Sequence, residues 1–253
     1  MRDILNGFLL AISYFTIFTI NIKKFKESKR LYLSTLFSFP LIGVIFAILL
    51  YFIFETLTLF YKEYYIAIFC SLIYFILYGF LHLDALADIV DAYFASFSNK
   101  NIYEVLKDSH IGAMGVCSLI IFIALKTLAL YEVFLSQNTL LILIIAFTLS
   151  RFSITVLLLH YKPHQKSIFA NALKDSLSKS SFLIVTLFIF SFLILLTGVI
   201  KTVTIFSITY ISTLFIAKKI ENRFGFINGD VIGFNIEIIE LILLNTLLLL
   251  LQN

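Results

Sequence analysis

"NTLLILIIAFTLSRFSITVLLLH", residues 138–160, is a run of 23 residues in which Arg151 is the one permanently charged side chain. A membrane-spanning helix needs about 20 predominantly apolar residues, so this run predicts a helix that crosses a bilayer. The rest of the chain has the same character: of 253 residues, 61% are hydrophobic and 13% charged, and the mean hydropathy is +1.04. This composition excludes a soluble globular protein and predicts an all-α, polytopic membrane bundle.

Apolar runs recur between charged stretches and give a direct count of eight spans. The first carries Asn6 and Gly7 and is alternatively interfacial or re-entrant, and the seventh is short and rich in Ser and Thr. We therefore expect six to eight transmembrane helices in one domain, residues 1–253. Cys70 and Cys117 lie inside apolar runs, so neither a disulfide framework nor a zinc site is expected. The expected spans are 4–22, 36–60, 64–84, 113–131, 138–160, 181–200, 202–217 and 231–251.

Basic residues concentrate in alternate loops. Fourteen of the 19 Lys and Arg residues fall in four loops, whereas the opposite loops hold only Lys62 and Lys201. Such asymmetry places basic loops in the cytoplasm, so we expect a multi-pass protein of the cell (inner) membrane. The same lysines also suit anionic lipids of the bilayer. The four basic loops are 23–35, 85–112, 161–180 and 218–230.

"GFLHLDALADIVDAY", residues 79–93, places three aspartates where an apolar run ends. Asp84, Asp88 and Asp91 are four and then three residues apart, so a helix carries them on one face over about 10 Å. Three carboxylates so close repel one another unless a cation lies between them. Oxygen ligands suit Mg²⁺, which commonly binds one or two carboxylates together with substrate phosphates. A solvated helix end is the alternative interpretation.

A second acidic segment is "ENRFGFINGDVIGFNIEIIE", residues 221–240. Asp230, Glu237 and Glu240 also share one helical face, and acids inside an apolar span should face the bundle interior. Gly225, Gly229 and Gly233 surround Asp230. Both acidic segments emerge in basic loops, which predicts one composite site on the cytoplasmic loops 85–112 and 218–240.

Two further features accompany the acidic segments. "KDSHIGAMGV", residues 107–116, offers Lys107 for a phosphate, Asp108 as another carboxylate, and glycines at a helix start, where backbone amides bind anions. Helix packing is the alternative for Gly112 and Gly115. Arg151 needs a buried partner, either a carboxylate within the bundle or a substrate phosphate.

Three segments together resemble the cobalamin synthase (adenosylcobinamide-GDP ribazoletransferase) family. "HLDALADIVDAY", "LKDSHIGAMGV" and "NGDVIGFNIEIIE" are similar, in order and spacing, to the family patterns HLDGLADxxDG, KDSRIGxxG and TGDxLGAxxExxE. "FPLIG" at 39–43 resembles the early FPxxG. The departures, listed by position, are Ala85 and Ala92 for glycine, His110 for arginine and Asn228 for threonine.

The resemblance implies a late step of vitamin B12 synthesis, in which adenosylcobinamide-GDP and α-ribazole, or its 5′-phosphate, are joined with release of GMP. It implies Mg²⁺ as cofactor and an in-line displacement at the cobinamide-linked phosphorus, with Asp91 as a candidate base. No nucleic-acid partner is expected, and a homo-oligomer or a complex with other nucleotide-loop enzymes is left open. The candidate residues are Asp84, Asp88, Asp91, Asp108 and Asp230 for the metal; Asp91, Asp88 and Lys107 for catalysis; and Arg151, Gly112, Gly229 and Asn228 for substrate contact.

Two other functions are considered. A CDP-alcohol phosphatidyltransferase needs a DxxDGxxAR pattern, but the spacing here is DxxxDxxD and no arginine follows until Arg151. A cation or proton transporter needs acids near mid-span and inverted repeats. The acids here gather at one side, and the two halves show no matching segments.

Overall fold

The computed structural model describes residues 2–18, 20, 25–98, 102–108 and 110–251, and every regular element within these ranges is helical. A short 3₁₀ turn, Ser96–Ser98, follows the fourth helix. The helices are α1 (Arg2–Phe15), α2 (Lys29–Thr58), α3 (Glu63–Leu77), α4 (Leu81–Ala95), α5 (Ile102–Val105), α6 (Ala113–Phe134), α7 (Thr139–His160), α8 (Ile168–Ser176), α9 (Lys179–Thr197), α10 (Val199–Phe224) and α11 (Gly229–Leu251).

Six of the described helices are long and apolar enough to cross a membrane: α2, α6, α7, α9, α10 and α11. Helices α3 and α4 are bent by 80° relative to each other. They add a seventh crossing if the pair counts as one broken span. The break holds Gly79 and Phe80, whose φ angles are +79° and +59°. Positive φ is uncommon for a bulky residue, so the chain turns sharply here. The expectation of an all-α polytopic bundle with six to eight spans is confirmed at its lower end.

The expected span 4–22 does not form, which lowers the direct count of eight. Helix α1 has 14 residues, so it is about 21 Å long at 1.5 Å per residue, whereas the hydrocarbon core is about 30 Å thick. After α1 the backbone N–H of Ile17 donates to the carbonyl oxygen of Leu77. Residues 19, 21 and 22 of this expected span lie outside the described residues.

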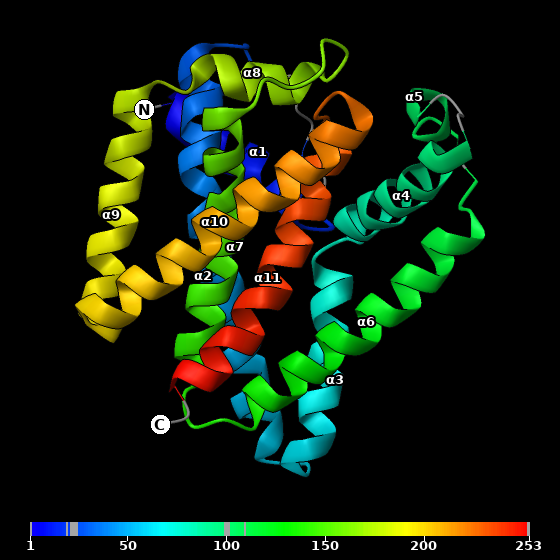
Figure 1. Cartoon of the computed structure of the whole chain (residues 1–253). Coiled ribbons are helices and arrows are strands. Elements are labelled where there is room, and N and C mark those ends of the chain that lie inside the picture. Colours follow the sequence, from blue (N-terminus) through cyan, green and yellow to red (C-terminus); the bar gives the residue numbers. More distant parts are fainter. Residues whose placement is uncertain (1, 19, 21–24, 99–101, 109, 252–253) are drawn as a thin grey trace.

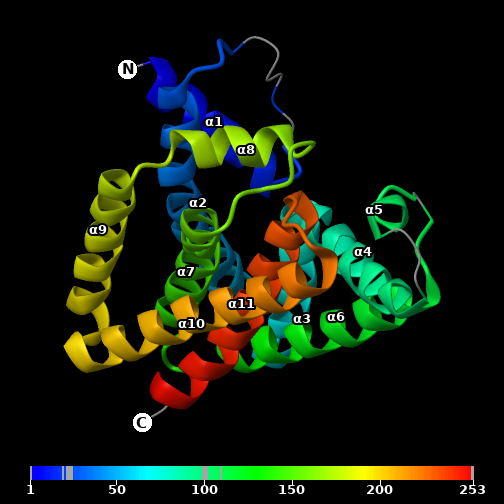
Figure 2. The ribbon, with the colours of Figure 1, turned by 45° about the horizontal axis from the view of Figure 1, so that its top comes forward.

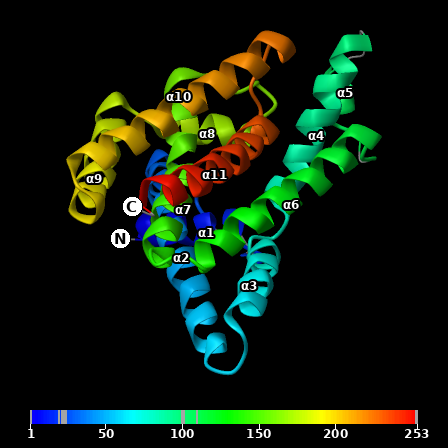
Figure 3. The same ribbon diagram turned by 60° about the horizontal axis from the view of Figure 1, so that its bottom comes forward.

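Helix α7 occupies the centre of the bundle. Figure 3 shows α7 and α11 between α9 and α10 on one side and α3, α4 and α6 on the other, and in Figure 1 α10 crosses in front of α7 and α11. Gly43 on α2 lets the two backbones touch, because a Cβ atom there would lie 2.8 Å from the backbone nitrogen of Thr148 and closer still to the Phe147 carbonyl. Small residues permit such close helix approach in membranes. The apolar run at residues 138–160 thus contains the core helix of the bundle.

The basic segments gather at one end of the molecule. In Figure 1 the start of α2, helix α5, helix α8 and the turn between α10 and α11 all lie toward the upper end, and the C-terminus lies at the opposite end. Helix α8 lies across this end, close to α1 and α2 (Figure 2). The alternation of basic and non-basic loops therefore corresponds to the two ends of the bundle.

Substitution of Gly43 by valine should destabilise the protein, because the added side chain meets the α7 backbone. Overpacking of this kind costs about 1–3 kcal/mol. Thermal unfolding in detergent micelles measures the effect. Leu41→Val, at an exposed α2 position nearby, is the control and should leave the melting temperature nearly unchanged. Equal melting temperatures for both variants would contradict the close α2–α7 contact.

Candidate active site

A polar cavity of about 360 Å³ lies at the basic end of the bundle. It is formed where α1, α4, α8 and the start of α11 meet, so the two acidic segments of the sequence contribute to one site. The lining residues are Tyr14, Phe39, His82, Asp84, Ala85, Ile154, Ser167, Ile168, Phe169, Ala170, Leu173, Asn228, Gly229, Asp230 and Ile232. Of the two loops expected to form the site, 218–240 contributes Asp230 and its neighbours to this lining, whereas 85–112 contributes only Ala85, and Asp84 comes directly before it.

The carboxylates of the two segments act on one another electrostatically. Asp84 and Asp230 both line the cavity, and their negative charges repel each other. Asp88, one turn after Asp84 on α4, is half-buried and is influenced by Asp84, Asp230 and Asp91. Like charges held so close favour a bound cation. Helix α4 thus carries the acidic stripe, with Asp84 at the cavity and Asp88 one turn further along the helix.

Asn228 fixes the start of α11. Its Oδ1 accepts a hydrogen bond from the backbone N–H of Val231 at 3.0 Å, and its Nδ2 donates to Oδ2 of Asp230 at 2.6 Å. The first bond is an N-cap, for which asparagine and threonine are both suited. The residue that departs from the family pattern therefore keeps the capping role and also orients Asp230. Gly229, beside it, lines the cavity and has open space around its Cα.

Asp91 is held by the start of α6. Its carboxylate accepts hydrogen bonds from the backbone N–H groups of Gly112 at 2.7 Å and Gly115 at 2.8 Å. A Cβ atom at Gly112 would lie 2.5 Å from Oδ1 of Asp91, so both glycines make room for this carboxylate. A helix N-terminus attracts anions, and here the anion is a side chain of the protein. This geometry favours a positioning role for Asp91, which joins α4 to α6.

Asp108 and Lys107 are not among the residues that line the cavity. Oδ1 of Asp108 is 2.7 Å from Nδ1 of His110 and accepts the His110 backbone N–H at 3.0 Å. These hydrogen bonds hold the pKa of Asp108 below its ordinary value. The ammonium group of Lys107 lies 4.9 Å from the ring centroid of Tyr103. The structure thus groups Asp84, Asp88 and Asp230 but does not bring Asp108 to them.

Arg151 pairs with a carboxylate inside the bundle. Its Nη1 donates to Oε2 of Glu240 at 2.8 Å and to the Phe147 carbonyl at 2.9 Å, and the side chain is fully buried. Lys126 on α6 forms ion pairs with Glu240, at 2.9 Å, and with Glu237. The expectation that these two glutamates face the interior is confirmed. Of the two partners considered for Arg151, the structure shows the carboxylate.

His82 is a cavity residue to which the sequence pattern assigned no role. It is 1% exposed, lines the cavity, and is surrounded by the rings of Tyr14, Phe15 and Tyr78 at 5.1–5.3 Å between centroids. Its position two residues before Asp84 was the available signal. Gly233 admits it, because a Cβ atom there would lie 3.0 Å from Nδ1 of His82.

The same glycine explains one departure from the family pattern. A Cβ atom at Gly233 would lie 2.9 Å from the Cβ of Ala85. Ala85 therefore fits against α11 because residue 233 has no side chain. Ala92 is fully buried, and nothing in the structure explains its replacement of glycine.

Within the described ranges, no three His, Cys, Asp or Glu side chains are grouped so as to hold a metal ion by themselves. The donors at the cavity nevertheless fit Mg²⁺, which usually binds through one or two carboxylates and completes its shell with waters and substrate phosphates. Asp84 and Asp230 supply two such carboxylates on one cavity. A site of this kind is completed by the substrate.

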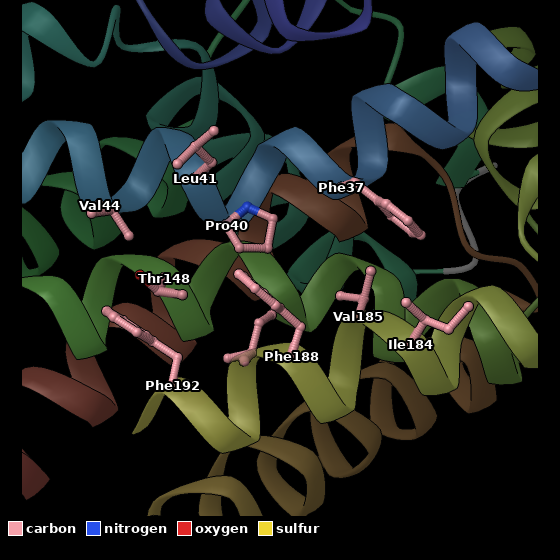
Figure 4. A pocket seen from close by; sticks show the side chains of 10 residues that line it. Phe37, Pro40, Leu41, Val44, Thr148, Ile184, Val185, Phe188 and Phe192 are labelled. Carbon is pink, nitrogen blue, oxygen red and sulfur yellow. The ribbon is translucent and has the colours of Figure 1, made fainter. Parts of the chain in front are cut away.

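A larger cavity of about 520 Å³ lies between α2, α7 and α9. Figure 4 shows its apolar side chains, among them Pro40, Phe188 and Phe192. No charged residue lines it, and Thr148 is its one hydroxyl-bearing side chain. This cavity lacks the groups that phosphate or metal chemistry needs, so the smaller polar cavity is the candidate active site.

Replacement of Glu240 by alanine should strongly destabilise the protein, because Arg151 and Lys126 would keep buried charges without this carboxylate. Breaking a buried ion pair from one side costs about 3–5 kcal/mol. Chemical or thermal unfolding in detergent measures the loss. Glu132→Ala removes an exposed glutamate of α6 and serves as the matched control. A Glu240 variant as stable as the control would refute the structural role of the network.

The chain was compared with known proteins. It matches the family described as cobalamin-5-phosphate synthase over residues 7–248. A protein of Clostridium tetani named adenosylcobinamide-GDP ribazoletransferase is 32% identical over 203 residues, 80% of each chain. A protein of the same name from Clostridium botulinum strain Okra is 30% identical over 253 residues, 98% of this chain and 100% of that one. No solved structure matches the chain.

The family match covers both acidic segments and the glycines between them, and the relatives extend over nearly the same length as this chain. The resemblance seen in the sequence motifs is thus confirmed over the whole molecule. The protein belongs to the cobalamin-5-phosphate synthase family.

Proposed function

We propose that this protein is a Mg²⁺-dependent adenosylcobinamide-GDP ribazoletransferase, a phosphotransferase that joins the cobinamide phosphate of adenosylcobinamide-GDP to α-ribazole or α-ribazole 5′-phosphate and releases GMP. Family membership and the names of the relatives support the reaction. The observation on which the proposal depends is that the carboxylates of Asp84 and Asp230 line the same polar cavity. The phosphatidyltransferase and transporter alternatives find no support in the family match.

The cavity is suited to a phosphate-containing substrate. Asp84 and Asp230, with Asp88 behind them, would hold Mg²⁺, which when bound neutralises the oxygens of the substrate diphosphate. The ribazole hydroxyl oxygen attacks the cobinamide-linked phosphorus, and the bond from that phosphorus to the bridging oxygen breaks, so that GMP leaves with this oxygen. The hydroxyl proton passes to a carboxylate of the acidic group.

Residues around the acids position them. Asn228 orients Asp230 and begins α11. Asp91 connects α4 to the start of α6 through Gly112 and Gly115, which holds Asp84 and Asp88 in register with α11. We assign Asp91 this positioning role in place of the proton acceptor expected from its place in the motif. Arg151 acts through the buried ion pairs and not on the substrate.

The proposal includes the location of the reaction. The described parts of the four basic loops lie at the end of the bundle that holds the cavity, and the positive-inside rule assigns such loops to the cytoplasm. We therefore place the cavity at the cytoplasmic face of the cell (inner) membrane, where water-soluble α-ribazole would enter.

Asp84→Asn and Asp230→Asn should each lower the rate of GMP formation at least about 100-fold, since each removes a charge from the cavity. Purified protein in lipid nanodiscs, supplied with adenosylcobinamide-GDP and α-ribazole, provides the assay, with Mg²⁺ added or removed by EDTA. Asp175→Asn changes an exposed aspartate of α8 and should keep wild-type activity. Full activity of either cavity variant, or activity in EDTA, would rule out the proposed metal site.

A further inference from the structure

Two lysines from different segments lie against one tyrosine ring at the basic end. The ammonium groups of Lys107 and Lys166 are 4.9 and 4.5 Å from the ring centroid of Tyr103. The His164 ring lies 5.2 Å from the same ring and 5.1 Å from that of Phe226. We call these five residues the Tyr103 cluster. It joins α5 to the segments before α8 and before α11.

The Tyr103 cluster borders the candidate active site. The backbone N–H of His164 donates to the Ile227 carbonyl at 2.6 Å, and Pro163 and Ile227 form an isolated parallel bridge. These contacts fasten the segment before α8 to the segment before α11. Ser167, three residues after His164, and Asn228, directly after Ile227, line the polar cavity. The segments before α8 and before α11 thus carry both the cluster and part of the cavity lining, so the cluster lies at the rim of that cavity.

Neither lysine has a counter-ion within the described part of the chain. Both side chains are exposed, and neither ammonium group forms an ion pair with a described residue. A tyrosine ring attracts a cation by about 0.5–1 kcal/mol at an exposed site but carries no net charge. The two positive charges of the cluster therefore favour an anion, and a phosphate offers several oxygens to them.

A second cation beside the acidic cavity would stabilise the leaving group of the proposed reaction. The leaving group carries a phosphate whose negative charge grows as the bond breaks. Arg151 is fully buried against Glu240, and the Arg223 guanidinium packs on Phe97 and donates to Ser96. Lys107 and Lys166 are the exposed cations that the structure brings together beside the cavity.

We infer that the Tyr103 cluster is a binding site for the nucleoside-phosphate end of the substrate, in which Lys107 and Lys166 together contact the phosphate that leaves with guanosine. This inference rests on the proposed function and adds to it the residues that bind the leaving nucleotide. Tyr103 and His164 hold the two lysines in place and thereby reduce the conformational entropy lost on binding.

Steady-state kinetics of the full-length protein in nanodiscs test the inference. Lys107→Gln and Lys166→Gln should each raise the KM for adenosylcobinamide-GDP about tenfold, which corresponds to the loss of one charge-assisted contact of about 1.4 kcal/mol. The KM for α-ribazole should not change, and product inhibition by GMP should weaken in parallel. Lys166→Arg should restore most of the affinity.

Lys179→Gln is the matched control, since this exposed lysine begins α9 at the same end of the bundle. It should leave the kinetics unchanged. Wild-type KM values and GMP inhibition in both cluster variants would overturn the inference. An effect seen in nanodiscs with phosphatidylglycerol but absent in pure phosphatidylcholine would overturn it too, because the lysines would then bind lipid headgroups.

The two proposals fail separately. If the wild-type protein forms GMP and the cluster variants behave like the control, the assignment of the lysines falls and the transferase function stands. If the wild-type protein forms no GMP, the transferase function falls. Equilibrium dialysis with labelled GDP then tests the cluster directly: weaker binding by the Lys107 and Lys166 variants supports a nucleotide site, and unchanged binding overturns it.

Discussion

The ion pairs among Arg151, Lys126, Glu240 and Glu237 constrain the rest of the bundle. Each charge lies in an apolar interior, where an isolated ion is costly and must have a partner. Glu240 receives Arg151 from α7, Lys126 from α6 and the hydroxyl of Tyr74 from α3. Three helices, α3, α6 and α7, are thus tied to one carboxylate of α11, which cannot rotate or slide without leaving a charge unpaired.

The position of the active-site acids follows from that constraint. Asp230 lies on the same face of α11 as Glu237 and Glu240, nearer the start of the helix. Once the buried pairs fix α11, Asp230 is placed at the basic end, opposite α4. Gly233 then allows α4 to approach closely enough for Asp84 to line the same cavity. Two turns further along α4, Asp91 accepts hydrogen bonds from the start of α6. Buried charge pairing, close helix contact and a helix N-cap together hold the two cavity carboxylates.

Much of this arrangement could be predicted from residue patterns. The long apolar runs required helices, and the alternation of basic loops grouped the correct segments at one end. Helical spacing placed the acids on common faces and directed Glu237 and Glu240 inward. Asp91 and its glycines could not be resolved in this way, because a carboxylate that binds a metal and one that caps a helix have the same spacing. Likewise, Asp108 shares a motif with the glycines but lies outside the cavity, since its position depends on a loop whose course carries no periodic signal.

Residue patterns alone predict a bundle of membrane-spanning helices with acidic motifs at one end, because hydrophobicity, helical periodicity and charge asymmetry are local properties of the chain. Which charges pair with one another depends on the packing of the helices. The residue pattern is compatible with either a substrate phosphate or a glutamate as the partner of Arg151, and the structure shows the glutamate. The pattern also does not indicate that Lys107 and Lys166 lie beside the same tyrosine ring. Such pairings depend on distances between residues far apart in the chain, which are set by how the helices pack and by the requirement that buried charges be neutralised.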